Sequence, residues 1–130
     1  MEDLKIKISA LWVARMLTGF LGDVLRFMEP GMLEQIISGE TGGMQLTDEL
    51  LTISAIIMIL PIIMVYLSLT LENKLNRLLN ILVALFIILF DFVGLFTYNY
   101  IYSMLLIFVG LIFCAVIIWH AWKLPLEAKN

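Results

Sequence analysis

Four charged residues interrupt the apolar stretches of this 130-residue chain: Arg15, Asp23, Arg26 and Asp91. A guanidinium can bridge two carboxylates, and two carboxylates beside one cation can share a proton or hold a positive ion. Each charge at membrane depth costs roughly 2.5–3.5 kcal/mol on insertion scales, so it must face protein, water or lipid headgroups. We therefore expect the helices that carry these residues to turn them toward one another.

The composition identifies the environment of these charges. Hydrophobic residues make up 62% of the chain and charged residues 15%, whereas a soluble domain contains about 25% charged residues. The chain is therefore predicted to be an integral protein of the cell membrane, with the lipid bilayer as its surroundings and room for roughly four spanning helices in one domain, 1–130. The net charge of −3 gives no indication of nucleic-acid binding.

Four apolar stretches predict an all-α fold, a four-helix transmembrane bundle. The helices are expected at residues 4–28, 48–71, 75–96 and 99–123. Because an α-helix turns by about 100° per residue, the first one has a polar and small-residue face and an opposite, bulky face suited to lipid. The polar face contains Ile8, Arg15, Thr18, Gly19, Gly22 and Arg26, with Asp23 at its edge, and the lipid face contains Val13, Leu17, Phe20 and Val24.

The connection between the first two long helices is expected to contain a short interfacial helix. Pro30 can occupy its first turn, and the helix can run through Ser38 to a stop at Gly39. It would either rest on the membrane surface or cover the mouth of the bundle as a lid. Thr47 is a predicted N-cap for the next helix, with Asp48 in its first turn.

Periodic residues on the remaining helices predict how those helices pack. Pro61 removes one backbone hydrogen bond and should kink the second long helix. The third carries Asn80 and Asp91 on one face. Two packing seams are expected, one formed by Ser54, Pro61 and Ser68, and one of small residues formed by Ser103, Gly110, Cys114 and Ala121.

The distribution of cations predicts the orientation of the chain. Lysines and arginines flank the termini and the turn between the second and third long helices, whereas the connection after the first helix contains only acids. Positive charges accumulate on the cytoplasmic side of a membrane. Both termini are therefore expected to be cytoplasmic. That orientation puts Asp23, Arg26 and Asp91 in the outer half of the membrane and Arg15 in the inner half.

Two interpretations of these charges stay open. Asp23, Arg26 and Asp91 could form a network that fixes the first helix against the third, or a buried acid site that binds a cation or relays protons. Arg15 could extend to inner-leaflet phosphates, or face the interior beside Asn80, near the kink at Pro61. These six residues are the candidate ligand-binding or proton-coupling site.

The spacing gives no support for catalysis or metal binding. Cys114 has no histidine or acid at a useful spacing, and no Cys/His cluster or nucleophile–base pair is visible. No catalytic residue, metal ligand or cofactor is predicted, and an enzyme is the least favoured class of function.

Four runs of the chain form a recognisable pattern: residues 22–31, 42–47, 60–68 and 76–80. They resemble a family of small prokaryotic four-helix membrane proteins classified as a domain of unknown function. The resemblance implies that four helices form one unit, and it supplies no activity or ligand. Family members often have an aromatic residue after the Asn-Arg pair, where this chain has Leu78. A second likeness, on Arg15-x-x-x-Gly19 alone, is to the DoxX-like four-helix membrane proteins.

Two functions follow from the sequence. The first is a protein that binds or transports a small molecule or ion through a polar intramembrane pocket; transport would need a homo-oligomer, because four helices make a thin wall. The second is a non-catalytic accessory or scaffold protein whose buried charges only specify helix packing.

Overall fold

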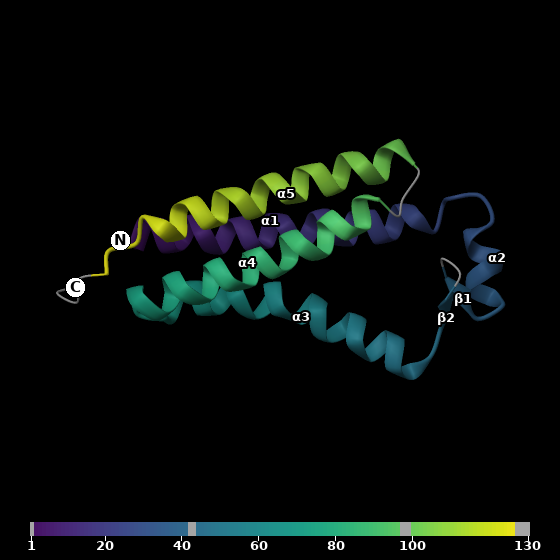
Figure 1. Cartoon of the computed structure of the whole chain (residues 1–130), viewed down its shortest axis with the longest axis horizontal. Coiled ribbons are helices and arrows are strands. Elements are labelled where there is room, and N and C mark those ends of the chain that lie inside the picture. The colour runs from purple at the N-terminus through teal and green to yellow at the C-terminus, as the bar shows by residue number, and fades with distance from the viewer. Residues whose placement is uncertain (1, 42–43, 97–99, 127–130) are drawn as a thin grey trace.

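The computed structural model describes residues 2–41, 44–96 and 100–126. Four long helices dominate it, and the only strands among the described residues are two residues long, so the predicted all-α fold is confirmed (Figure 1). The bounds of the long helices lie within two residues of those expected. The elements are α1 (Glu2–Arg26), α2 (Met32–Ile37), β1 (Glu40–Thr41), β2 (Met44–Gln45), α3 (Asp48–Thr70), α4 (Asn73–Leu95) and α5 (Ile101–Trp122).

Helices that follow one another along the chain are neighbours in the bundle. α1 packs along both α3 and α5, and α4 packs along α5, while α3 and α4 meet over a short stretch only. α1 and α4 therefore lie diagonally across the bundle and run in the same direction (Figure 1). A contact between these two helices has to cross the core.

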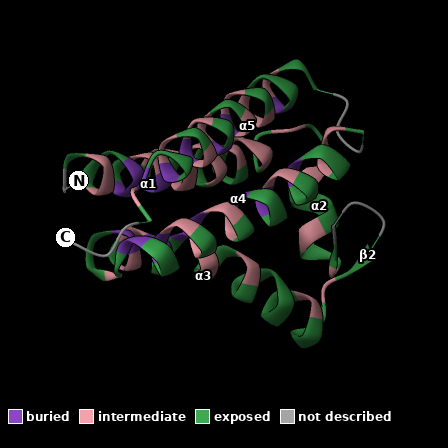
Figure 2. Cartoon of the chain, turned by 60° about the vertical axis from the view of Figure 1, so that its left-hand side comes forward, coloured by how far each residue is buried: buried purple, intermediate pink, exposed green. Residues whose placement is uncertain are grey.

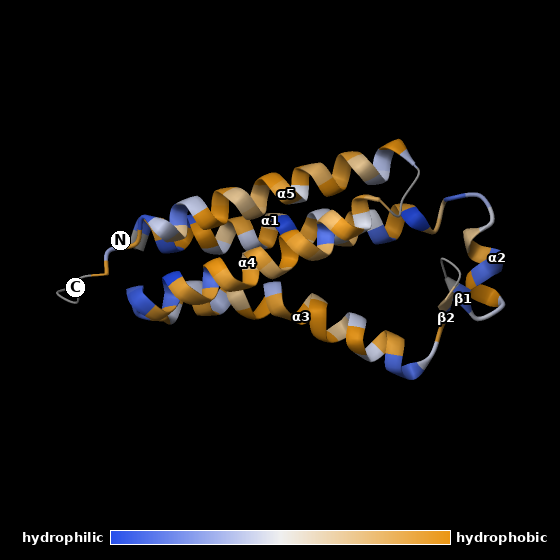
Figure 3. Cartoon of the chain, viewed as in Figure 1, coloured by the Kyte–Doolittle hydropathy of each residue, from blue (hydrophilic) through white to orange (hydrophobic). Residues whose placement is uncertain are grey.

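The four long helices are long and apolar enough to cross a membrane. Figure 3 shows hydrophobic residues along each of them and hydrophilic residues at the two ends of the bundle. In the described part of the chain these are four candidate spans, with α1 the least apolar of them. The chain is thus a multi-pass membrane protein.

Burial confirms the predicted faces of α1 and α5. The lipid face of α1 is exposed, with Leu17 and Phe20 each about 60% accessible, and all four small residues of the predicted α5 seam are buried. Because small side chains let helices approach closely, this seam explains how α5 packs against both α1 and α4. The core lies toward the end of the bundle that holds the termini, as Figure 2 shows. It consists of Ile8, Trp12, Met64, Ala84, Ile87, Cys114, Ile117, Ala121 and Leu124.

Pro61 divides α3 into a half with buried residues and a more exposed half. Pro61, Met64 and Ser68 are buried, whereas the residues before Pro61 are exposed or half-buried. The ribbon of α3 bends near its middle and diverges from α4 toward its first residue (Figure 1), in line with the backbone hydrogen bond that a proline removes. The predicted seam is therefore wrong at Ser54, which is exposed.

The connection from α1 to α3 is more structured than expected. α2 begins at Met32 rather than Pro30, because Gly31 adopts a left-handed conformation with φ 82°. β1 and β2 pair antiparallel, Thr41 opposite Met44, which the sequence did not predict. The Thr47 N-cap is confirmed, since its Oγ1 accepts from the backbone N–H of Leu50 at 3.1 Å.

Candidate functional site

An ion pair joins the two diagonal helices. Nη2 of Arg15 on α1 donates to both carboxylate oxygens of Asp91 on α4, each at 2.6 Å. The side chains are 13% and 9% exposed. Charge-assisted hydrogen bonds of this kind are short and strong, and a buried charge needs such a partner. The pair therefore gives each of these two buried charges a counter-charge, although Nε of Arg15 has no hydrogen-bond partner among the described residues.

This pairing corrects the expected one. Arg26 was the predicted partner of Asp91, and Asn80 or lipid phosphates were the predicted partners of Arg15. The amide of Asn80 instead accepts from the indole Nε1 of Trp12 at 2.6 Å. Trp12 had not been singled out from the sequence; its position one turn before Arg15, on the same face of α1, was the available signal.

A polar network surrounds Asn80. It lies nearer than the Arg15–Asp91 pair to the end of the bundle that holds both chain termini, called the terminal end below. Asn80 Oδ1 also accepts from the hydroxyl of Ser68 at 3.1 Å, and its amide nitrogen donates to the backbone carbonyl of Asn76 at 2.9 Å. Asn76 in turn donates to the carbonyl of Ser68 at 2.8 Å. Ser68, Asn76 and Asn80 are fully buried, so these bonds replace the water that the groups lose.

The two side chains of α1 extend in opposite directions along the bundle. Trp12 and Arg15 are three residues apart, about 4.5 Å of helix rise, whereas their partners Asn80 and Asp91 are eleven apart, about 16 Å. Because α1 and α4 run the same way, Trp12 reaches toward the terminal end and Arg15 toward the opposite end. The expectation that Arg15 leans toward the termini is therefore wrong.

Asp23 and Arg26 form a second, looser pair. Nη1 of Arg26 lies 3.8 Å from Oδ1 of Asp23, one helical turn away, and the two side chains are 28% and 53% exposed. Asp23 is thus the most accessible carboxylate on this face of α1. Beyond the helix end, the hydroxyl of Tyr102 on α5 donates to the carboxylate of Glu29, which fastens the turn after α1 to the start of α5.

A cavity of about 390 Å³ lies beside these charges. Its walls come chiefly from α1, α4 and α5, with one residue from α3 and one from β2, and they combine charged, small and apolar side chains. A volume of this order suits a small ligand. The lining residues are Arg15, Thr18, Gly19, Gly22, Asp23, Arg26, Met44, Met58, Phe90, Asp91, Val93, Gly94, Ser103, Leu106 and Ile107.

Two glycines make room for the guanidinium of Arg15. A Cβ atom at Gly19 would lie 3.0 Å from Nη1, and one at Gly110 would lie 3.1 Å from Nε. Such distances are shorter than normal contacts, so a side chain at either position would require the guanidinium to shift by a few tenths of an ångström. The ion pair thus depends on small residues from α1 and α5 as well as on its own charges.

The cavity gathers four of the six candidate residues, namely Arg15, Asp23, Arg26 and Asp91. Asn80 lies outside it in the buried amide network, and Pro61 lies outside it at the bend of α3. The roles of the six in ligand binding or proton coupling stay predictions. Within the described residues, no group of three His, Cys, Asp or Glu side chains is placed to hold a metal ion.

The fold and the cavity define a small all-α membrane protein with charged residues on the wall of a cavity between its long helices. The chain belongs to the family of unknown function DUF6326, whose profile matches residues 1–126. This membership agrees with the resemblance to a domain of unknown function that the sequence predicts. No curated protein and no solved structure matches the chain.

Proposed function

We propose that this protein binds a small molecule or ion in its intramembrane cavity. The observation that carries the proposal is the cavity of about 390 Å³ with two carboxylates and two guanidinium groups on its wall. Charged groups in membrane-spanning segments commonly mark substrate or ion pathways. Apolar side chains such as Phe90 and Leu106 share the same wall, so the site can hold a ligand that is partly apolar.

The cavity lies in the outer half of the membrane, with both termini cytoplasmic. This orientation is supported by Lys5, Lys7, Lys74, Arg77 and Lys123 at the terminal end of the bundle, against an acidic connection at the other end. Reporter fusions at both termini test it. A periplasmic or extracellular reporter at either end contradicts it.

Cysteine accessibility tests the cavity directly. In a Cys114→Ala background, Ser103→Cys places a thiol on the cavity wall, and Phe108→Cys places one on the outer face of the same helix, where Phe108 is 60% exposed. A small water-soluble methanethiosulfonate should modify Ser103→Cys in membranes and leave Phe108→Cys unmodified, because a thiol facing lipid does not ionise. An unreactive Ser103→Cys would contradict the proposal that the cavity binds a ligand.

Transport of the ligand would require a second copy of the chain, because four helices form a thin wall. Native mass spectrometry of gently purified protein measures the oligomeric state and any retained ligand together. A strict monomer would restrict the proposal to binding.

The competing function is that of an accessory or scaffold protein without a ligand. The Arg15–Asp91 pair favours it, because a contact at 2.6 Å across the core already gives both buried charges a partner. This function predicts that no cavity-lining thiol is reached from water; a loss of stability in Asp91→Asn follows from the ion pair under either function and does not distinguish them.

A further inference from the structure

We propose that the ligand of this cavity is an organic cation with an apolar body, and that Asp23 is its counter-ion. This inference rests on the proposed function and adds the charge and chemical class of the ligand. Three observations support it. The four charged side chains on the cavity wall differ in exposure and in the strength of their ion pairs, apolar residues lie beside them, and the end of the bundle near α2 is acidic.

The charges on the cavity wall are not equally available to a ligand. Asp91 is 9% exposed, and both of its oxygens accept from Arg15. The guanidinium of Arg15 is held between Gly19 and Gly110. An incoming molecule therefore finds this deep pair already neutralised and enclosed by protein.

Asp23 is the available charge. Its side chain is 53% exposed, whereas that of Arg26 is 28% exposed, and the two are 3.8 Å apart, at the outer limit of an ion pair. A carboxylate held this loosely can accept a second cation without losing a strong bond. The most accessible charge on the cavity wall is thus negative.

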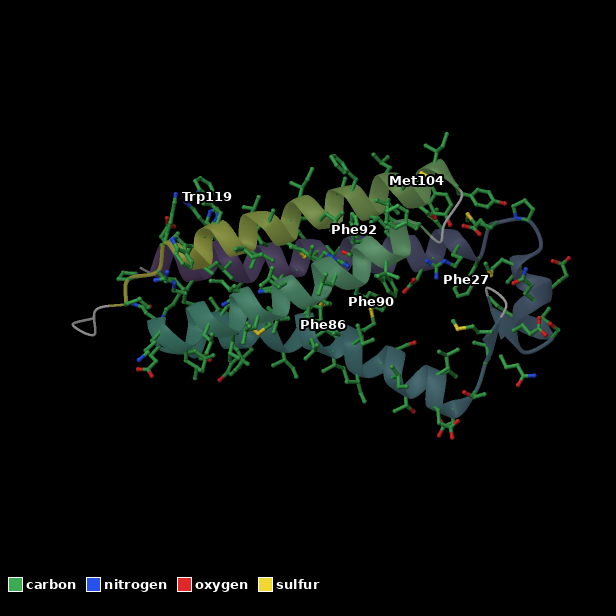
Figure 4. All side chains as sticks on the ribbon, in the orientation of Figure 1. Phe27, Phe86, Phe90, Phe92, Met104 and Trp119 are labelled. Atoms are coloured by element: carbon green, nitrogen blue, oxygen red, sulfur yellow. The ribbon has the colours of Figure 1, made fainter. Side chains whose placement is uncertain are left out.

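The apolar part of the wall suits the body of such a cation. Phe90 of α4 and Met58 of α3 line the cavity, and Met44 of β2 adds a second thioether. Figure 4 shows Phe90 between the ribbons of α4 and α3. The face of an aromatic ring attracts cations, and flexible methionines adapt to varied apolar shapes.

The end of the bundle beyond the cavity has the charge that attracts cations. Residues 27–73 contain no lysine or arginine. The connection from α1 to α3 carries three acids, Glu29, Glu34 and Glu40, and the first turn of α3 adds Asp48 and Glu49. Hydrophilic residues gather at this end around α2 and β1 (Figure 3). A surface of one charge sign raises the local concentration of ions of the opposite sign.

A set of matched probes tests the sign of the ligand charge. The protein is placed in nanodiscs of phosphatidylcholine, so that lipid charge does not contribute, and titrated by calorimetry against empty nanodiscs. The probes are benzyltrimethylammonium, its uncharged isostere neopentylbenzene, and benzenesulfonate. We expect saturable binding of benzyltrimethylammonium, with a Kd at least about fivefold lower than that of either other probe.

Substitutions test the role of Asp23. Asp23→Asn should raise the Kd for benzyltrimethylammonium at least about fivefold, because it removes one charge contact and keeps the shape. Glu34→Gln is the matched control: it removes an acid at the same end, outside the cavity lining, and should change the Kd less than twofold. Phe90→Leu keeps the apolar volume, removes the aromatic face and should weaken binding about two- to fivefold.

The outcomes separate this inference from the proposed function. Equal or tighter binding of benzenesulfonate, or an unchanged Kd in Asp23→Asn, overturns the cationic ligand and leaves the cavity as a binding site. The same holds if Ser103→Cys is reactive and none of the three probes binds. If no probe binds and Ser103→Cys is unreactive, both the cationic ligand and the proposed ligand-binding function are contradicted.

Discussion

Nη2 of Arg15 contacts both carboxylate oxygens of Asp91 at 2.6 Å, and these residues belong to the two helices that lie diagonally across the bundle. A contact between adjacent helices fixes one interface, whereas this one spans the core and constrains α1 and α4 together. The pair also forms part of the cavity wall, so the same atoms contribute to stability and to the electrostatics of the site.

Removing one member of this pair should be costly. Asp91→Asn leaves the guanidinium of Arg15 buried without its counter-charge, and we expect a loss of about 3–5 kcal/mol in the free energy of unfolding. Unfolding by dodecyl sulfate in mixed micelles measures this quantity. Asp23→Asn is the control: its ion pair is half-exposed and 3.8 Å long, so its loss should stay below about 1 kcal/mol. Equal losses in the two variants would contradict a special role for the diagonal pair.

Gly110 should tolerate a methyl group less well than Gly22. A Cβ at Gly110 meets Nε of Arg15 at 3.1 Å, whereas one at Gly22 meets Cδ1 of Leu106 at an ordinary 3.6 Å. Gly110→Ala should therefore destabilise the protein by about 1–3 kcal/mol, and Gly22→Ala should be close to neutral. Thermal unfolding in detergent compares the two, and a neutral Gly110→Ala would show that the guanidinium can move aside without loss.

The amide network should respond to the loss of a single acceptor. Asn80→Leu leaves the indole N–H of Trp12 and the hydroxyl of Ser68 buried without their present acceptor, at about 1–3 kcal/mol for each group. Tryptophan emission reports any change around Trp12, and thermal unfolding reports the stability. Leu78→Ala, on the exposed side of the same helix, should leave both readouts nearly unchanged. Little effect of Asn80→Leu would mean that other acceptors replace the amide.

The two halves of α3 should differ in their sensitivity to truncation. Met64 is 2% exposed and lies in the core, so Met64→Ala should cost about 2 kcal/mol or more. Ile56 is 57% exposed in the half before Pro61, so Ile56→Ala removes no packed contact and should cost well under 1 kcal/mol. The comparison is made by unfolding in mixed micelles. A similar cost at both positions would indicate that another molecule covers the first half of α3.

Periodicity in the sequence was sufficient to predict the helices and their faces. The exposed face of α1 and the small-residue seam of α5 follow from a 100° rotation per residue, and burial confirms both. The partner of Asp91 could not be predicted in this way. The height of Asp91 along its helix suggested Arg26 as the partner. A long arginine side chain extends several ångströms along the helix axis, however, and sequence spacing does not specify in which direction.

The prediction that Ser54 lies in a packing seam failed for a different reason. Its spacing from Pro61 and Ser68 places it on the same helical face, yet the bend of α3 carries that face away from α4. A proline within a helix predicts a bend, but the direction of the bend depends on how the neighbouring helices pack. The cavity likewise arises from the relative placement of five elements, which no local pattern contains.

The distance along the chain between Arg15 and Asp91 has a consequence for biosynthesis. The two residues are 76 positions apart, and at 5–20 residues per second a ribosome needs roughly 4–15 s to make the intervening chain. α1, the least apolar of the four spans, therefore leaves the ribosome with a cation whose counter-charge does not yet exist. We expect α1 to be held in the bilayer less firmly until α4 has been synthesised, so truncation before Asp91 should increase the fraction of chains in which α1 does not span the membrane.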